Sequence, residues 1–429
     1  MIGSVTTRYA SDGCDHEPAP ILSVEQVQRY LIERVLPVAG KEVVATETAL
    51  GRVLAEDQRS LMNIPGADNS AMDGYALASR DIEHAGEFRL VVSQRIAAGQ
   101  VGQPLAPGTA VRIFAGAWLP PGADTVAMQE HCRIEPDGTV VIPGPVTRGA
   151  HVRRAGEDIA AGACILRRGT RLRAQDLGLA ASVGLARLPV FRRLRVALLS
   201  TGNELVEPGA ALRPGQIYNS NLYMLAGLLQ GLGCEWFSAG WVPDDPTQTH
   251  EALERAAEAA DLVIATGGVS VGEEDHVKAA IRDIGHLDLW RVAVKPGKPL
   301  AFGRIGATPF LGLPGNPVSA FVTFCLFVRP FVQRSQGIVC GQGGADTVPR
   351  SFPVVAGFEW SGAKKRREYL RARLRLTENG ATIVEIYPNQ SSAALTSAAW
   401  AEGLVEVPEG HTVAHGQTVR FFPFSELLS

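Results

Sequence analysis

The sequence lacks the paired cysteines and clustered histidines that hold metals or form disulfides. Its 6 cysteines are scattered along 429 residues, and its 9 histidines stand singly. This pattern excludes a zinc knuckle and a disulfide framework, and it is typical of a reducing compartment. The P-loop, the dinucleotide-binding fingerprint and the G-x-S-x-G element are missing as well, so the sequence offers no candidate for nucleophilic catalysis.

Long apolar runs and a strong net charge are also missing. The longest apolar segment, 320–328, is far shorter than the roughly twenty residues that a bilayer requires. Residues 1–20 are polar, carry no secretion signal and are expected to form a flexible tail. A net charge of -3 gives no field for a nucleic-acid backbone. We therefore expect a soluble, cytoplasmic protein that binds a small molecule, with no nucleic acid and no membrane.

Composition and length indicate several globular domains. With 46% hydrophobic and 20% charged residues, the chain is ordinary globular material but too long for one core. Changes in the hydrophobic pattern predict a multidomain α/β plus β fold. After the tail, the expected parts are a discontinuous N-terminal linker domain with helices over 21–60 and 160–190, an inserted β domain over 61–159, an α/β domain with a mostly parallel sheet over 191–345, and a C-terminal β domain over 346–429.

The spacing of apolar residues predicts the individual helices and strands. A capping box formed by Ser23 and Gln26 predicts a helix over about 23–36. Further helices are predicted at 174–181, 221–232, 247–260 and 276–284. Strands are predicted at 88–92, 110–114, 125–128, 140–142, 196–199, near 236, 262–265, 290–295, 369–376, 381–386 and 418–422.

Glycine-rich turns join a strand to a helix at three places. The clearest is 310–321, where Asn316 is a ready helix N-cap and Pro317 suits the first helical position. The others are 198–204 and 264–275. Free backbone amides at such turns favour anions, and the ends of parallel strands meet at one edge of their sheet. Together, the three junctions predict a pocket for an anionic ligand.

Basic residues follow the predicted strand 290–295. In a strand, Arg291 and Lys295 would share one face, and the turn at 296–297 would bring Lys298 close to Lys295. Such a cluster could hold phosphate or oxyanion charge. A solvated hairpin with lysines extended into water is the alternative, which we would prefer if the glycine-rich turns were not nearby.

Acidic residues accompany the same turns. Carboxylates beside a phosphate site usually imply a divalent cation, so Glu204 and Asp275 are candidate ligands of Mg²⁺. Asp245 precedes a proline at a helix start, and an ordinary helix cap is its better interpretation. The spacing alone leaves Asp244 undecided.

Several ordered motifs spread along the chain resemble the MoeA family of molybdopterin molybdenumtransferases, which is related to the gephyrin E domain. The resemblance runs from about residue 21 to the end. The motifs are SAMDGYA at 70–76, PGAD at 121–124, GED at 156–158, STGNEL at 200–205, TGGVSVG at 266–272, KPGKP at 295–299 and LPGNP at 313–317. A chance match of so many ordered motifs is far less probable than that of one glycine-rich loop.

The resemblance implies a homodimer whose α/β domain has the molybdopterin-binding fold, with the inserted domain of one subunit lining the site of the other. It also implies a reaction, in which adenylylated molybdopterin and molybdate give molybdenum cofactor and AMP with the help of Mg²⁺. The sequence Asp73-Gly74 alone would favour a hairpin turn. The resemblance instead gives Asp73 a role in the site.

The site residues that the resemblance and the turns imply fall into three groups. The catalytic candidates are Asp73, Glu204, Asp244 and Asp275. The metal candidates are Glu204 and Asp275. The substrate-binding candidates are Asp158, Thr201, Gly202, Gly267, Gly268, Ser270, Arg291, Lys295, Lys298, Pro314, Gly315, Asn316, Arg371 and Ser392. For Arg371, the local sequence alone favours a solvated strand face shared with Arg373 and Arg375.

One position departs from the family pattern. Where many relatives carry threonine, the segment 112–117 has Ala115, which offers no hydroxyl. Loss of one donor near a desolvated anion would weaken binding by about 1 to 3 kcal/mol. The alternative to an enzyme is therefore a scaffold protein that retains the pterin pocket without turnover.

Overall fold

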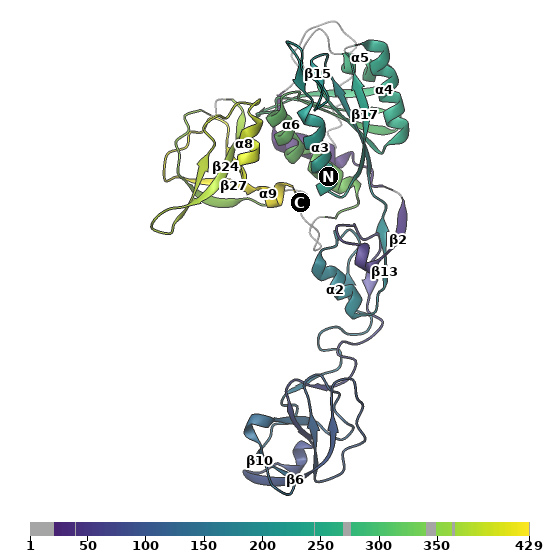
Figure 1. Cartoon of the computed structure of the whole chain (residues 1–429), viewed down its shortest axis with the longest axis vertical. Helices are drawn as coiled ribbons and strands as arrows, with labels where there is room; N and C mark the ends of the chain where they lie inside the picture. The colour runs from purple at the N-terminus through teal and green to yellow at the C-terminus, as the bar shows by residue number, and fades with distance from the viewer. Residues whose placement is uncertain are drawn as a thin grey trace, which may run out of the picture. The chain divides into compact units, whose positions relative to one another are not determined.

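The computed structural model describes residues 21–38, 40–243, 245–268, 276–339, 349–362 and 365–428, and only the backbone at 289 and 290. Contacts within the chain define two compact units (Figure 1). Unit 1 takes its residues from 1–42, 51–53 and 191–429, and unit 2 takes them from 43–50 and 54–190. The five-part division proposed from the sequence stays a prediction.

Unit 1 contains a seven-stranded mixed sheet. Its spatial order is β1 (Ile21–Leu22), β19 (Gly285–Val292), β21 (Pro299–Ile305), β22 (Thr308–Leu313), β18 (Leu262–Thr266), β14 (Arg195–Thr201) and β17 (Glu235–Val242). The pairs that involve β21 are antiparallel, and the other neighbouring pairs are parallel. The mostly parallel sheet predicted for this part of the chain is confirmed.

Helices cover both faces of this sheet (Figure 1). Successive strand side chains point to opposite faces, so the near-continuous apolar strand β14 must be buried on both. Val196 and Leu198 pack with the helices on one side, whereas Ala197 and Leu199 pack with those on the other. The first side holds α1 (Val24–Glu33), α3 (Ser220–Gly231), α6 (Pro317–Thr323), the π-helical turn η4 (Phe324–Val328) and α7 (Arg329–Ser335), and the second holds α4 (Pro246–Ala259) and α5 (His276–Ile284).

The helices α1, α3, α4 and α5 begin within one residue of the predicted positions. Ser23 and Gln26 form the capping box of α1, and Asp245 caps α4 through its side chain. The helix α1 ends at Glu33, earlier than the predicted 36, with Pro37 following in sequence. Within the described ranges, every helix falls short of the length and apolar character needed to cross a bilayer.

The C-terminal part of unit 1 is a six-stranded sheet in which five strands close into a ring and β20 adds to β24 at its edge. Pairing of β24 with β26 completes the ring, and Leu370, Val384, Val405 and Phe421 fill its interior. The order is β20 (Val294–Lys295), β24 (Arg367–Leu376), β25 (Thr382–Ile386), β23 (Phe352–Ala356), β27 (Thr418–Pro423) and β26 (Gly403–Val407). The helices α8 (Leu395–Trp400) and α9 (Phe424–Leu427) accompany it.

The predicted continuous strand over 290–295 is wrong. The chain leaves the seven-stranded sheet after Val292, and its next residues form β20 in the C-terminal sheet. The amide of Ala293 donates to the Leu22 carbonyl, while the Ala293 carbonyl accepts from the amide of Arg367. Because each neighbour of Ala293 binds a different sheet, Arg291 and Lys295 do not belong to one strand face.

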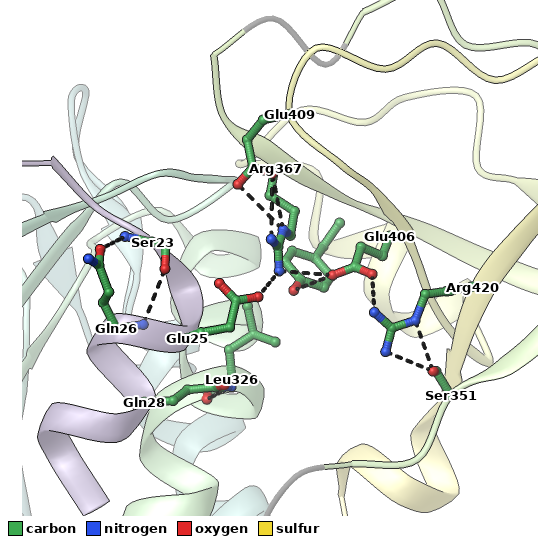
Figure 2. A network of polar contacts seen from close by, with 11 residues as sticks. Ser23, Glu25, Gln26, Gln28, Leu326, Ser351, Arg367, Glu406, Glu409 and Arg420 are labelled. Carbon is green, nitrogen blue, oxygen red and sulfur yellow. Dashed lines mark hydrogen bonds and ion pairs between the residues drawn. The ribbon is translucent and has the colours of Figure 1, made fainter.

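A polar network ties α1 to the C-terminal sheet (Figure 2). The guanidinium of Arg367 contacts the carboxylate of Glu25 from α1, and it lies 3.2 Å from Glu406 and 3.4 Å from Glu409. Arg420 reaches the other oxygen of Glu406 at 2.8 Å. The side chain of Glu406 is 4% exposed, so the two arginines offset the cost of burying its carboxylate.

Unit 2 contains a six-stranded sheet with apolar side chains on both faces, such as Tyr75 on one and Ala76 on the other. Its order is β8 (Thr125–Met128), β5 (Gly74–Leu77), β7 (Thr109–Ile113), β6 (Gly86–Ile96), β10 (Thr139–Gly144) and β9 (Arg133–Ile134). Smaller pairs join β4 (Asn69–Ser70) to β11 (Val152–Arg153), β3 (Gln58–Arg59) to β12 (Cys164–Leu166) and β2 (Lys41–Ala45) to β13 (Arg187–Phe191). The helix α2 (Ala174–Ser182) packs on a core that includes Leu54, Leu172 and Leu188.

The hairpin expected from Asp73-Gly74 does not form. The strand before it, β4, pairs with β11, and the strand after it, β5, pairs with β7 and β8. A Cβ atom at Gly74 would lie 2.0 Å from the Ala127 carbonyl oxygen, so the glycine permits the approach of β5 to β8.

We expect the Glu25→Gln variant to unfold with a free energy about 0.5 kcal/mol lower than the wild type at pH 7, because an ion pair on a half-exposed carboxylate is lost. Burial raises the pKa of Glu25, but hydrogen bonds from Arg367, from the backbone amide of Glu25 and from Ser23, together with the charge of Arg367, outweigh burial and hold the pKa below its ordinary value. The stabilisation is therefore present above the ordinary glutamate pKa and disappears as the pH falls through the lowered one. Urea unfolding at several pH values measures the difference, and a difference independent of pH would contradict this account.

Candidate functional site

A cavity of about 710 Å³ lies where β14, β18 and β22 end. These parallel strands are neighbours in the sheet, so their carboxyl ends meet at one edge. The described lining residues are Thr201, Glu204, Leu205, Ile217, Tyr218, Asn219, Ser220, Asn221, Thr266, Gly267, Gly268, Pro299, Pro314, Gly315, Asn316, Pro317, Ser319 and Ala393. The three predicted junctions thus meet at one cavity.

The turn after β14 carries Glu204. Gly202 has a φ of +138°, and a Cβ atom there would lie 2.5 Å from Oε2 of Glu204. The glycine therefore lets the carboxylate fold back against the turn at the mouth of the cavity. The indole N–H of Trp241, at the end of β17, donates to the Gly202 carbonyl at 2.8 Å and holds the turn in place.

The turn after β18 packs directly on the first. Gly267 has a φ of +86°, and a Cβ atom there would lie 2.5 Å from the carbonyl oxygen of Thr201. Gly268 has a φ of +61°, and a Cβ atom there would lie 2.6 Å from Cγ2 of Val277. Both positions need glycine because the backbone is left-handed and the neighbours are close.

The turn after β22 leads into α6, whose first residue is Pro317 as predicted. Asn316 is the N-cap residue, but its side chain makes no capping hydrogen bond, so that part of the prediction is wrong. The turn is held instead by Asn221 of α3, whose Nδ2 donates to the Gly315 carbonyl at 2.8 Å.

The C-terminal sheet reaches the cavity through the segment before α8. The amide of Val318 in α6 donates to the Ser392 carbonyl at 3.0 Å, and the next residue, Ala393, lines the cavity. Ser392 is therefore joined to the site through its backbone.

Arg371 is buried in the C-terminal sheet, which corrects the solvated strand face suggested by its local sequence. Its side chain donates to Ser397 Oγ and to the Tyr369 carbonyl, each at 3.1 Å, and to the Ser391 carbonyl at 3.4 Å. Burial lowers the pKa of Arg371 to about 10, so it remains charged at neutral pH. The guanidinium thus fixes the segment that carries Ser392.

The predicted cluster of basic residues does not line the cavity. Nζ of Lys295 lies 3.1 Å from the carboxylate of Glu368, whose side chain is 5% exposed and also accepts from the indole of Trp360. Arg291, Lys295 and Lys298 are all missing from the described lining. The charge of Lys295 is thus paired with that of Glu368 within unit 1.

Two predicted residues lie in unit 2. Oδ1 of Asp73 accepts from the backbone amide of Ala115 at 2.9 Å. Asp158 is exposed and lines another cavity, of about 550 Å³, together with Asn69 and Arg153. Ala115, the position that departs from the family pattern, therefore holds Asp73 through its backbone N–H. Every residue except proline would supply the same donor.

Three predicted residues, Asp244, Ser270 and Asp275, lie outside the described residues. Among the residues that the structure does describe, no group of three or more His, Cys, Asp or Glu could hold a metal ion. Mg²⁺ commonly uses one or two protein carboxylates together with phosphate oxygens and water, so Glu204 at the cavity mouth fits such a mode.

Sequence reasoning missed a fourth element of the cavity, the start of α3. Asn219, Ser220 and Asn221 all line it, and Asn219 caps the helix by accepting from the Leu222 amide. A polar Asn-Ser-Asn run directly before an apolar helix was the available signal. The short parallel pair β15 (Leu205–Val206) and β16 (Ile217–Tyr218), which flanks the cavity, gave no comparable signal.

Family models match most of the chain. The MoeA N-terminal region (domain I and II) matches residues 22–184, a probable molybdopterin binding domain matches 197–334, and the MoeA C-terminal region (domain IV) matches 353–424. The molybdopterin molybdenumtransferase of Haemophilus influenzae is 37% identical over 95% of this chain and 100% of its own length. The chain belongs to the MoeA family.

Other members of the MoeA family agree with this assignment. Molybdopterin molybdenumtransferase 2 of Mycobacterium tuberculosis is 37% identical over 90% of this chain and 95% of its own length. The solved structure of the molybdopterin biosynthesis moeA protein from Pyrococcus horikoshii OT3 is 27% identical, covers 94% of this chain and 100% of its own, and superposes with a TM-score of 0.80. The MoeA fold, with its α/β domain and C-terminal β barrel, is therefore the fold of this chain.

The glycine turns allow a matched test of stability. The Gly267→Ala variant should lose at least about 2 kcal/mol of unfolding free energy, because its backbone is left-handed and the new Cβ would meet the Thr201 carbonyl. The Gly315→Ala variant should change it by less than about 0.5 kcal/mol, since the nearest atom to its Cβ would be 3.9 Å away. Thermal and urea unfolding measure both variants, and equal losses would refute the close-packing argument.

Proposed function

We propose that this protein inserts molybdenum into adenylylated molybdopterin, giving molybdenum cofactor and AMP, with molybdate as the second substrate. The observation that carries the proposal is the cavity beside Glu204 in a chain that is 37% identical, over 95% of its length, to a curated molybdopterin molybdenumtransferase. The cytoplasm is the proposed compartment, in keeping with the unpaired cysteine pattern of the sequence.

Acidic residues are the proposed catalytic groups, namely Asp73, Glu204, Asp244 and Asp275. Because the sequence offers no nucleophile, their contribution would be positioning and control of charge around the phosphoanhydride and the molybdate. Glu204 and Asp275 are the proposed ligands of Mg²⁺. When bound, Mg²⁺ would neutralise phosphoanhydride charge.

Substrate binding is proposed for the turns at the cavity and for the nearby basic residues. The exposed Lys298 is adjacent in sequence to the lining residue Pro299. The charged side chain of Arg371 donates to the carbonyl of Ser391, which precedes Ser392. The full proposed set is Asp158, Thr201, Gly202, Gly267, Gly268, Ser270, Arg291, Lys295, Lys298, Pro314, Gly315, Asn316, Arg371 and Ser392.

The proposed assembly is a homodimer with each site at the subunit interface. The MoeA resemblance supports a contribution of Asp73 and Asp158 from the second subunit. Both residues belong to unit 2, and neither is among the described residues that line the cavity of unit 1.

The Glu204→Gln variant tests the proposed role of the acid. Molybdate-dependent AMP release should fall at least about a hundredfold, because charge control at the reacting groups is lost. The melting temperature should stay unchanged, since Glu204 is exposed. The matched control is Glu207→Gln, an exposed acid three positions on that bonds Tyr223 and does not line the cavity. Normal AMP release by Glu204→Gln would remove this residue from the mechanism.

A non-catalytic scaffold that binds molybdopterin is the second candidate, and Ala115 is the observation in its favour. Incubation of the purified protein with adenylylated molybdopterin, Mg²⁺ and molybdate separates the two functions. Release of AMP together with loaded cofactor supports the enzyme, whereas binding without AMP release supports the scaffold.

The Ala115→Thr variant measures how much the absent hydroxyl would change the rate of AMP release. The backbone amide of Ala115 already fixes Asp73, so we expect the variant to change the rate of AMP release by less than about threefold. A rise of a hundredfold would show that the hydroxyl itself is needed for turnover and would favour the scaffold for the natural chain.

A further inference from the structure

A further cavity in unit 1, of about 380 Å³, lies between the end of α1 and the strands β19 and β21, and we call it the α1 cavity. Its described lining includes Tyr30, Arg34, His286, Asp288, Phe302 and Arg304. Pro299, the first residue of β21, lines the cavity described above, whereas Phe302 and Arg304 line this one. The two cavities therefore lie towards opposite ends of β21, and a ligand of the α1 cavity would be separate from the proposed substrate.

Two guanidinium groups give the α1 cavity a net positive charge. Arg34 and Arg304 contribute them, and Asp288 is the one acid among the described lining residues. Asp288 accepts a hydrogen bond from the hydroxyl of Tyr30 at 2.5 Å, and its other oxygen lies 3.0 Å from Nε2 of His286. Within the described part of the chain, neither guanidinium forms an ion pair. Both positive charges therefore lack a carboxylate partner.

Arg34 is exposed, but contacts with its neighbours hold its guanidinium in place. The guanidinium carbon lies 3.4 Å from the centre of the Tyr30 ring, and stacking of this kind orients the planar group. The Tyr30 ring is itself fixed by the bond to Asp288 and by an edge contact with Phe302, whose ring centre is 6.2 Å away.

Tyr30 adds no negative charge to the α1 cavity. Burial, together with the hydrogen bond to Asp288 and the charge of Asp288, outweighs the opposite effect of Arg34 and raises the pKa of Tyr30 to about 12. The hydroxyl is therefore protonated at neutral pH and remains the donor to Asp288.

Most N–H donors of the two guanidinium groups remain available. Nη1 of Arg34 donates to the Tyr30 carbonyl at 3.3 Å, and Nη2 of Arg304 donates to the Arg34 carbonyl at 3.4 Å. A guanidinium has five N–H donors, and among the described residues each group uses one of them. The bond from Arg304 to Arg34, the C-cap residue of α1, keeps the two arginines adjacent.

We propose that the α1 cavity binds a phosphate group between Arg34 and Arg304. A phosphate group carries about 1.5 to 2 negative charges at pH 7 and three strong acceptor oxygens, so it matches two adjacent guanidinium groups better than one carboxylate does. The volume falls within the range of small-molecule sites, about 300 to 1,000 Å³, which leaves room for the organic part of a phosphate ester. Inorganic phosphate and a small phosphate ester share this chemistry.

Titration calorimetry of the full chain with inorganic phosphate, at constant ionic strength in a chloride buffer, tests the proposal. Arg304→Gln and Arg34→Gln should each weaken phosphate binding by at least about tenfold, because charge-assisted hydrogen bonds are lost. Titration with glycerol phosphate distinguishes the two sources of the group. Tighter binding than that of inorganic phosphate identifies an ester as the ligand, and equal or weaker binding identifies the free ion.

Arg29→Gln is the matched control. Arg29 is exposed, belongs to α1 and is not among the described residues that line the cavity, so the variant makes the same change of charge on the same helix. Its affinity for phosphate should equal that of the wild type. If the half-buried Arg304→Gln fails to fold, the exposed Arg34→Gln still decides the question.

Three results would overturn the proposal. They are the absence of saturable phosphate binding by the wild type, phosphate affinities of Arg34→Gln and Arg304→Gln equal to that of Arg29→Gln, and tighter binding of succinate than of phosphate. AMP release by the wild type in phosphate-free buffer tests the proposed function separately, because phosphate binding at the α1 cavity does not require turnover. Arg304→Gln should release AMP at the wild-type rate in that buffer.

Discussion

The site depends on how closely the turns after β14 and β18 approach each other. Gly267 lies so near the Thr201 carbonyl that no side chain fits between the two turns. The backbone itself therefore forms one wall of the cavity, and the few side chains present, such as Glu204 and Asn221, decide its chemistry. The same edge is rigid because the strands leading to it are buried on both faces.

The C-terminal barrel is part of the site and is not an appendage. It is joined to the α/β part by β20, by the ion pair of Lys295 with Glu368, and by the bond between the Val318 amide and the Ser392 carbonyl. Arg371 holds the connecting segment from inside the barrel. A change in the barrel can therefore alter the cavity without touching a lining residue.

Local patterns predicted the fold well, because buried parallel strands and capped helices are encoded within short stretches. The strands around 196 and 262 and the helix 276–284 are confirmed. The pattern failed where long-range pairing decides the outcome: Ala293 divides a strand between two sheets, and Asp73-Gly74 joins strands with different partners. For the site, the junctions were visible in sequence, but the pairing of Lys295 with Glu368 joins residues 73 positions apart and left no local trace.

At Ala293 the chain passes from the seven-stranded sheet to the C-terminal sheet, and this connection limits where the molecule can be cut into fragments. The two residues of β20 belong by sequence to the α/β part, yet they extend the barrel beside Arg367 and Glu368. An excised C-terminal fragment would begin after β20 and would leave the first residues of β24 without that neighbour. Backbone groups released in this way attract other strands. Cutting the chain between β20 and β24 would thus expose an unpaired strand edge on the C-terminal fragment that is paired in the intact protein.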